Sequence, residues 1–208
     1  MQADHLNNFG WRSHEALQHH EYTIPAIMAL LPDSKPLNII DIGCGNGFLA
    51  HKLAEMGHNV VGIDIAEDGI KIASRSYPDI KFLVRSGYDN LDNLLNDSPN
   101  LIVSSEVIEH LYYPQKFLKN IHGSLAKGGH LILTTPYHGY MKNLAISIFD
   151  KWDKHHDSEE EGAHIKFFSE RTMKSILTKN GFHDIEYKNS GRIPYLWRSM
   201  VCRAQKKS

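Results

Sequence analysis

Apolar and polar residues follow one another along the chain in the rhythm of strands that alternate with helices. Short runs rich in Val, Ile and Leu predict buried parallel strands at 38–42, 59–63, 80–84, 101–104 and 130–135. Between these runs, apolar residues spaced three and four apart predict helices at 48–56, 65–77 and 114–126, with a shorter one near 91–95. Strands and helices in this order build a doubly wound, mostly parallel sheet.

The two ends of the chain depart from this rhythm. Residues 13–31 have helical spacing, with Ser13 placed to cap a first piece and Pro25 to begin or kink a second. After the fifth strand, 140–152 is helical in spacing and 155–162 is polar and acidic. Ser169 is placed to cap a last helix at 170–180, and 182–188 and 196–204 then form an antiparallel strand pair.

We therefore expect an α/β fold in a single domain, 1–208, whose seven-stranded sheet is mostly parallel and ends in an antiparallel C-terminal strand pair. Segment 1–36 is either a helical cap over a ligand or a helix packed on the sheet edge. Segment 137–163 is a long insertion, which we interpret as a substrate lid, with a helical cap that takes no part in chemistry as the alternative.

Composition narrows the class of protein. Of the 208 residues, 41% are hydrophobic and 23% charged, which is typical of a soluble globular chain. The net charge of -1 argues against a protein that neutralises many nucleic-acid phosphates, so we expect no nucleic-acid partner. No apolar run is long enough to span a membrane. Cys44, one of only two cysteines, lies within a glycine turn, which favours a reducing cytoplasm over a disulfide.

The stretch 38–64 carries the clearest chemistry, because a glycine turn joins its first strand to the following helix. Gly43, Gly45 and Gly47 let the backbone turn sharply and let a ligand approach closely. Asp64 ends the second strand, where a carboxylate can take both hydroxyls of a ribose. Asp41 precedes the glycines, where it would repel a pyrophosphate and attract a cation. S-adenosylmethionine is a nucleoside of that kind, since it carries a sulfonium and an ammonium but no phosphate.

The spacing Asp-x-Gly-x-Gly-x-Gly that begins at Asp41 resembles the first motif of the class I S-adenosylmethionine-dependent methyltransferases. The resemblance implies their Rossmann-like fold and S-adenosylmethionine as cofactor. Ser86 and Gly87 follow the third strand, where this fold usually places adenine contacts, although a simple loop is nearly as good an interpretation. The expected cofactor-binding set is Asp41, Gly43, Cys44, Gly45, Gly47, Asp64, Ile65, Ser86, Gly87, Ser105 and Glu106.

A second constellation follows the fourth strand. If Glu106 begins a helical turn, Glu109 and His110 lie three and four residues further on and face the same side. A hard divalent cation such as Mg²⁺ is a natural partner for two carboxylates. The expected metal set is Glu106, Glu109, His110 and His164, the last from the same end of the sheet. Alternatively, the two glutamates flank the cofactor with His110 packed over it, and either His110 or His164 acts as general base.

The same residues resemble two methyltransferase families. Over about 38–180 the chain is similar to the UbiG-like ubiquinone-biosynthesis O-methyltransferases. These enzymes carry Glu-x-x-Glu-His after the fourth strand and a His ahead of a Lys-Phe pair. They also use an N-terminal arginine near the cofactor, which has no clear counterpart in this chain. The small-RNA 2′-O-methyltransferases share the metal motif. The first resemblance implies O-methylation of a phenolic, catechol-like or polyhydroxylated small molecule. The alternatives are an RNA 2′-O-methyltransferase and a non-catalytic S-adenosylmethionine-binding protein.

Overall fold

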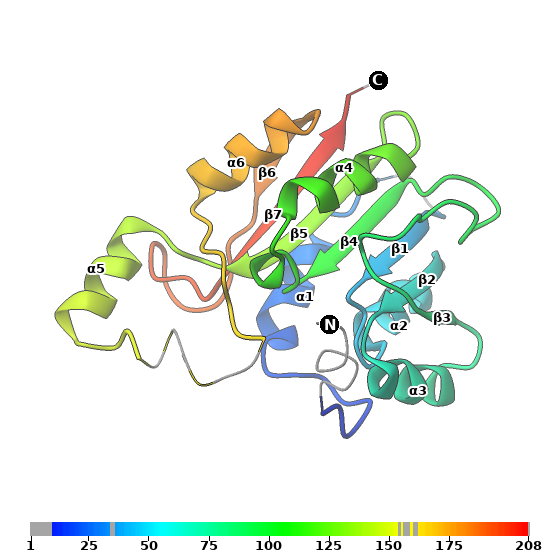
Figure 1. Cartoon of the computed structure of the whole chain (residues 1–208), viewed down its shortest axis with the longest axis horizontal. Helices are drawn as coiled ribbons and strands as arrows, with labels where there is room; N and C mark the ends of the chain where they lie inside the picture. The colour runs from blue at the N-terminus through cyan, green and yellow to red at the C-terminus, as the bar shows by residue number, and fades with distance from the viewer. Residues whose placement is uncertain (1–9, 34–35, 154, 156–158, 160–161, 208) are drawn as a thin grey trace.

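The structure is a computed structural model that describes residues 10–33, 36–153, 155, 159 and 162–207. A seven-stranded sheet crosses the molecule in the order β3-β2-β1-β4-β5-β7-β6 (Figure 1). The first five strands are parallel, and β7 runs antiparallel to both β5 and β6. The expected doubly wound sheet with an antiparallel C-terminal pair is therefore confirmed. The strands are β1 (Asn38–Ile42), β2 (Asn59–Asp64), β3 (Lys81–Val84), β4 (Leu101–Ser105), β5 (His130–Pro136), β6 (Phe182–Tyr187) and β7 (Ser199–Lys206).

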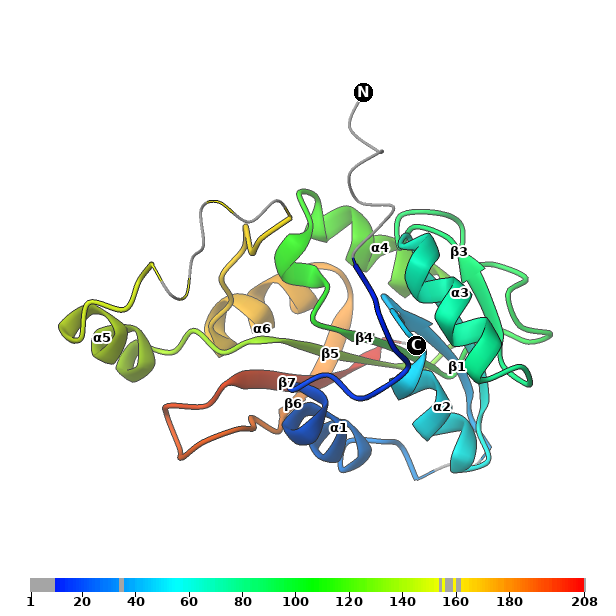
Figure 2. The same cartoon turned by 90° about the horizontal axis from the view of Figure 1, so that it is seen from below.

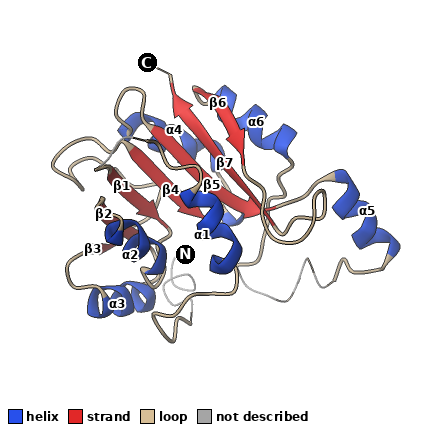
Figure 3. Cartoon of the chain, turned by 180° about the vertical axis from the view of Figure 1, so that it is seen from behind, coloured by secondary structure: helices blue, strands red, loops and turns tan. Residues whose placement is uncertain are grey.

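Helices cover both faces of the sheet (Figures 2 and 3). Each face has its own apolar core. One face packs against apolar residues of α1, α2 and α3, and the other against those of α4 and α6. Burial on both faces explains why the central strands are apolar almost throughout. The helices are α1 (His20–Met28), α2 (Phe48–Glu55), α3 (Glu67–Ser76), α4 (Pro114–Ser124), α5 (Tyr140–Ile148) and α6 (Glu170–Lys179), with a 3₁₀ turn η1 (Ile108–His110) after β4.

The N-terminal segment differs from the expectation. Residues 13–19 form no helix, and the Ser13 hydroxyl accepts a hydrogen bond from the Glu15 amide instead of capping one. The single helix α1 starts at His20 and holds Pro25 inside it rather than at its start. None of the helices in the described ranges is long and apolar enough to cross a lipid bilayer.

Two other helical predictions need correction. The leucines at 91–95 lie in a series of turns, because the Asn90 side chain accepts a hydrogen bond from the Asp92 amide and offers the backbone an alternative to helix. Leu91 and Leu94 are nevertheless buried in the core.

The helix expected at 140–152 is α5, which ends at Ile148. Most of the polar loop expected at 155–162 lies outside the described residues. Ser169 does cap α6, since its hydroxyl accepts from the Thr172 amide.

Candidate active site

The glycine turn after β1 is held against β2. The amides of Gly43 and Cys44 both donate to the carbonyl oxygen of Ile63. Gly43, Gly45 and Gly47 all have positive φ, at 78°, 51° and 80°. A Cβ on Gly45 would collide with the ring of Trp11, which lies across the turn. Glycine is therefore required at Gly45 both by backbone conformation and by the close approach of Trp11.

Asp64 closes the turn from the end of β2. Its Oδ2 accepts from the Gly45 amide at 2.8 Å, and its Oδ1 accepts from the Ala66 amide at 2.8 Å. Burial raises the pKa of Asp64, and the backbone hydrogen bonds from Ala66 and Gly45 oppose that rise. The carboxylate consequently lies beside the N-terminal end of α3, at the carboxyl edge of the sheet where ligands of such folds bind.

A small cavity of about 70 Å³ opens beside this turn. It brings together five of the eleven residues predicted to bind the cofactor. It also includes four that the sequence analysis missed, because nothing in their spacing connects them to the glycine turn. The lining residues are Trp11, His19, His20, Asp41, Gly43, Cys44, Leu49, Ser105 and Glu106.

Asp41 is the most unusual group in the cavity. The residue is 1% exposed, and neither carboxylate oxygen has a hydrogen-bond partner among the described residues. Burial and the nearby charge of Asp64 raise its pKa to about 7. The histidines in the cavity cannot neutralise it at pH 7, since burial lowers the pKa of His19, and that of His20 to about 4. The protein thus keeps a buried carboxyl group that is only about half ionised at pH 7 and that lacks a cation.

The remaining predicted cofactor residues lie outside the cavity. Gly47 is the residue before the first turn of α2. Ile65 follows Asp64 and is 36% exposed. Ser86 and Gly87 lie in the loop after β3, where the Ser86 hydroxyl accepts from the Tyr88 amide and a Cβ on Gly87 would press on Phe117. Their role toward a cofactor stays a prediction.

Glu106 does not begin a helical turn. Its φ is 55°, in the left-handed region, and η1 starts two residues later. The side chain is held from β5 and β7, because its Oε1 accepts from the Thr134 hydroxyl at 2.8 Å and from the Ser199 hydroxyl at 3.2 Å. Glu106 still lies close enough to Glu109 that its charge helps to raise the pKa of that carboxyl group.

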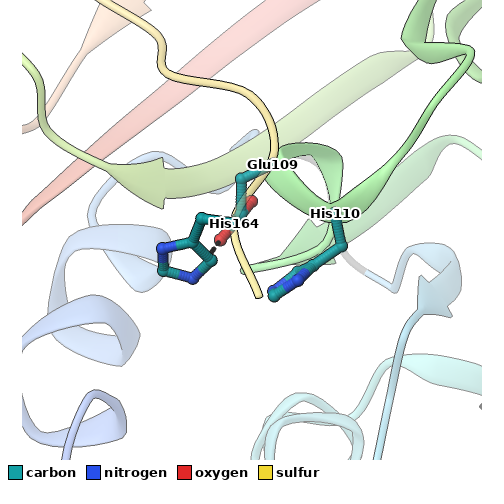
Figure 4. Close-up of side chains that lie close together, drawn as sticks. All are labelled: Glu109, His110 and His164. Atoms are coloured by element: carbon teal, nitrogen blue, oxygen red, sulfur yellow. Dashed lines mark ion pairs between the residues drawn. The ribbon is translucent and has the colours of Figure 1, made fainter. Parts of the chain in front are cut away.

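Glu109, His110 and His164 form a compact cluster (Figure 4). One ligand atom from each lies within 4.8 Å of the others, and Glu106 is not part of this group. His164 Nε2 is 3.9 Å from Glu109 Oε1. The amides of Ile165 and Lys166 both donate to the carbonyl oxygen of Glu109, so backbone hydrogen bonds bring His164 to η1.

The cluster has the chemistry of a cation site. Glu109 is 0% exposed, both its oxygens lack a hydrogen-bond partner among the described residues, and burial raises its pKa well above the usual value. His110 Nδ1 lies 2.6 Å from the carbonyl oxygen of Gly162. A carbonyl can only accept, so Nδ1 carries a proton, and in the neutral ring Nε2 therefore keeps its lone pair. Such an outer hydrogen bond orients a histidine that ligates a metal.

Comparison with known proteins identifies close similarity over most of the chain. The family model described as "Methyltransferase domain" matches residues 15–187. The mitochondrial ubiquinone biosynthesis O-methyltransferase of Rattus norvegicus is 32% identical over 158 residues, covering 71% of this chain and 45% of that protein. The ubiquinone biosynthesis O-methyltransferase of Rickettsia felis is 33% identical over 116 residues, covering 55% and 48%. The match therefore spans less than half the length of these curated relatives.

Solved structures share the fold at lower identity. The magnesium protoporphyrin IX methyltransferase of Synechocystis PCC 6803, solved with bound SAM, superposes with a TM-score of 0.67 at 18% identity, covering 99% of this chain and 95% of that one. A SAM-dependent methyltransferase from Methanosarcina mazei gives 0.66 at 21% identity, covering 88% and 97%. At this identity the likeness concerns the fold.

Proposed function

The chain belongs to the methyltransferase-domain family, and from this premise we propose that it transfers a methyl group from S-adenosylmethionine to an oxygen of a small-molecule acceptor. The observation that carries the proposal is the buried, unpartnered carboxylate of Asp41 beside the glycine turn. The similarity to ubiquinone biosynthesis O-methyltransferases supports oxygen as the atom methylated.

The charge distribution favours S-adenosylmethionine over dinucleotides. No lysine or arginine is among the residues that line the cavity, so a pyrophosphate would meet Asp41 without a compensating cation. An ammonium group would instead give Asp41 the charge-assisted hydrogen bonds that it lacks. Asp64 lies at the end of β2, where a carboxylate can accept from ribose hydroxyls, and the ring of Trp11 lies against Gly45 of the glycine turn.

We further propose that Glu109, His110 and His164 hold a divalent cation such as Mg²⁺. When bound, the cation would lower the pKa of an acceptor hydroxyl and fix its orientation. Glu109 supplies the buried negative charge, and the Gly162 carbonyl fixes the tautomer that leaves His110 Nε2 free to ligate. Glu106 is hydrogen-bonded to Thr134 and Ser199 and is not part of the cluster, so we do not expect it to ligate the cation. In the metal-free alternative, His164 or His110 accepts the hydroxyl proton directly.

The finer assignments of domain and location are also proposals. The described residues of 137–163 include α5, which extends beyond the carboxyl end of β5 (Figure 1), and this position supports a lid over the acceptor in a single methyltransferase domain. The N-terminal segment serves as a cover for the cofactor, supported by the contact of Trp11 with Gly45. Cys44 and Cys202 are free and buried, which fits a reducing compartment such as the cytoplasm.

A methyl-transfer screen tests the proposed activity. Catechols, polyhydroxylated compounds and small carboxylates are offered with labelled S-adenosylmethionine, with Mg²⁺ and with excess EDTA. We expect transfer to a catechol-type hydroxyl that EDTA abolishes. Full activity in EDTA would exclude a role for the cation and would favour the alternative in which His164 or His110 acts as the general base. Tight binding of S-adenosylmethionine without transfer to any acceptor would contradict the enzymatic assignment and favour a sensor.

A further inference from the structure

A second cavity, of about 130 Å³, lies between α5 and the loop that joins β6 to β7. These two segments lie side by side at the end of β5 in both views (Figures 1 and 2). Ile146 of α5, Phe149 directly after this helix and Leu196 from the loop form the apolar part of its wall. Lys142, Lys151 and Arg192 add positive charge to the same wall.

Lys142 is the central cation of this cavity. It is 7% exposed, and its Nζ makes one long hydrogen bond, 3.5 Å to the carbonyl oxygen of Arg198. Among the described residues it forms no ion pair, and neither do Arg192 and Arg198. A buried ammonium that lies near two guanidinium groups and forms no ion pair is costly unless a ligand brings further negative charge.

The electrostatics of Lys142 also connect this cavity to the proposed active site. Burial and the charges of Arg192 and Arg198 lower its pKa to about 8, while Glu106 acts in the opposite direction. Arg198 immediately precedes Ser199, whose hydroxyl donates to Glu106. The cationic cavity therefore adjoins the carboxylate that borders the cofactor cavity, rather than lying on an unrelated surface.

We propose that Lys142 and Arg192, which both line this cavity, bind a carboxylate of the methyl acceptor, whose hydroxyl is then presented toward Glu109 and His164. This inference rests on the proposed function, because it names the chemical class of that function's acceptor. The apolar wall suits the carbon skeleton between the two ends of such a molecule, and guanidinium groups bind carboxylates with paired hydrogen bonds. An acceptor with a hydroxyl at one end and a carboxylate at the other would be oriented by both cavities.

Matched acid and amide acceptors test the proposal. The series is 3,4-dihydroxybenzoate, 3,4-dihydroxyphenylacetate and 3-(3,4-dihydroxyphenyl)propanoate, each compared with its primary amide, so that reach is varied and charge is isolated. For at least one length we expect the KM of the acid to lie at least about 10-fold below that of the amide. Lys142→Met and Arg192→Gln should bring this ratio close to one. Lys119→Met, an exposed lysine on α4, serves as the control and should keep the wild-type ratio.

The outcomes separate this proposal from the proposed function. Equal KM values for acid and amide at every length, with turnover of both, would overturn the anionic pocket and leave the methyltransferase assignment intact. If no catechol is methylated, calorimetry of the same acids in the presence of S-adenosylhomocysteine decides. Binding of an acid that is lost in Lys142→Met but kept in Lys119→Met would support the pocket without the activity, and absence of binding would overturn it.

Discussion

Replacing Asp41 by Asn should make the ligand-free protein more stable while weakening its affinity for S-adenosylmethionine. Asn has nearly the same shape as Asp but cannot ionise, so it removes the buried charge and leaves the packing in place. The carboxylate oxygens have no hydrogen-bond partner among the described residues that the substitution would disrupt. A residue kept for stability alone would show the opposite pattern.

The size of the stabilisation depends on pH in a way that identifies its cause. The pKa of Asp41 is raised from 3.8 to about 7 in the folded protein. Between these values the folded state binds more protons than the unfolded state, so this residue lowers stability progressively as pH rises, and the loss levels off above pH 7. At 1.36 kcal/mol per pKa unit, the advantage of Asn is about 2 kcal/mol at pH 5 and about 4 kcal/mol at pH 8.

Urea unfolding of both proteins at pH 5 and pH 8 measures these differences, with constant m-values as the check that both unfold alike. Calorimetry at pH 8 measures affinity, and loss of one partner of a buried charge pair should weaken S-adenosylmethionine binding by at least about 30-fold, or 2 kcal/mol. The reasoning is refuted if Asp41→Asn is less stable than wild type at pH 8, or if it binds S-adenosylmethionine equally well.

Three further predictions concern the cluster, the cover and the second cavity. His164→Ala should lower cation affinity and methyl transfer by at least about 100-fold, because loss of a ligand costs more than the loss of an outer-shell hydrogen bond. Binding of S-adenosylmethionine, measured by calorimetry, should be retained. Unchanged Mg²⁺-dependent turnover would contradict the cation site. Because Trp11 lies over Gly45, S-adenosylmethionine should change the tryptophan fluorescence of wild type; a signal of equal size in Trp11→Phe would show that Trp11 does not report on the cavity. Lys142→Met should raise the free energy of unfolding by up to about 3 kcal/mol at pH 7, because the pKa of Lys142 is lowered from 10.5 to about 8 in the folded protein. The destabilisation by the buried lysine is complete below pH 8 and is lost as the pH rises toward 10.5. Equal stability of the two proteins at pH 7 in chemical denaturation would mean that burial of the lysine costs nothing.

Features set by local sequence could be predicted well. The strand, glycine turn and helix from Asn38 onward are confirmed, because apolar periodicity and glycine spacing act over a few neighbouring residues. The capping of α6 by Ser169 is confirmed for the same reason. Parallel alignment then brings the carboxyl ends of β1, β2 and β4 to one edge, so Asp41 and Ser105 could be grouped before their contacts were known.

Features set by distant parts of the chain could not be predicted in this way. Glu106 was expected to begin a helical turn, but Thr134 and Ser199 hold its side chain from two other strands. Trp11 reaches Gly45 across 34 residues without any periodic signal. Lys142 occupies a position on α5 that spacing alone cannot distinguish from an exposed one, and only packing against the β6–β7 loop buries it.

Calorimetric titration of the wild-type protein with S-adenosylmethionine at pH 8 and at pH 5.5 tests the central claim most directly, with NAD and ATP as competitors. If the carboxylate of Asp41 binds the cationic part of the cofactor, S-adenosylmethionine should bind more tightly at pH 8, where the carboxyl group of Asp41 is ionised, than at pH 5.5. Absence of binding at pH 8, or tighter binding of NAD or ATP than of S-adenosylmethionine, would contradict it.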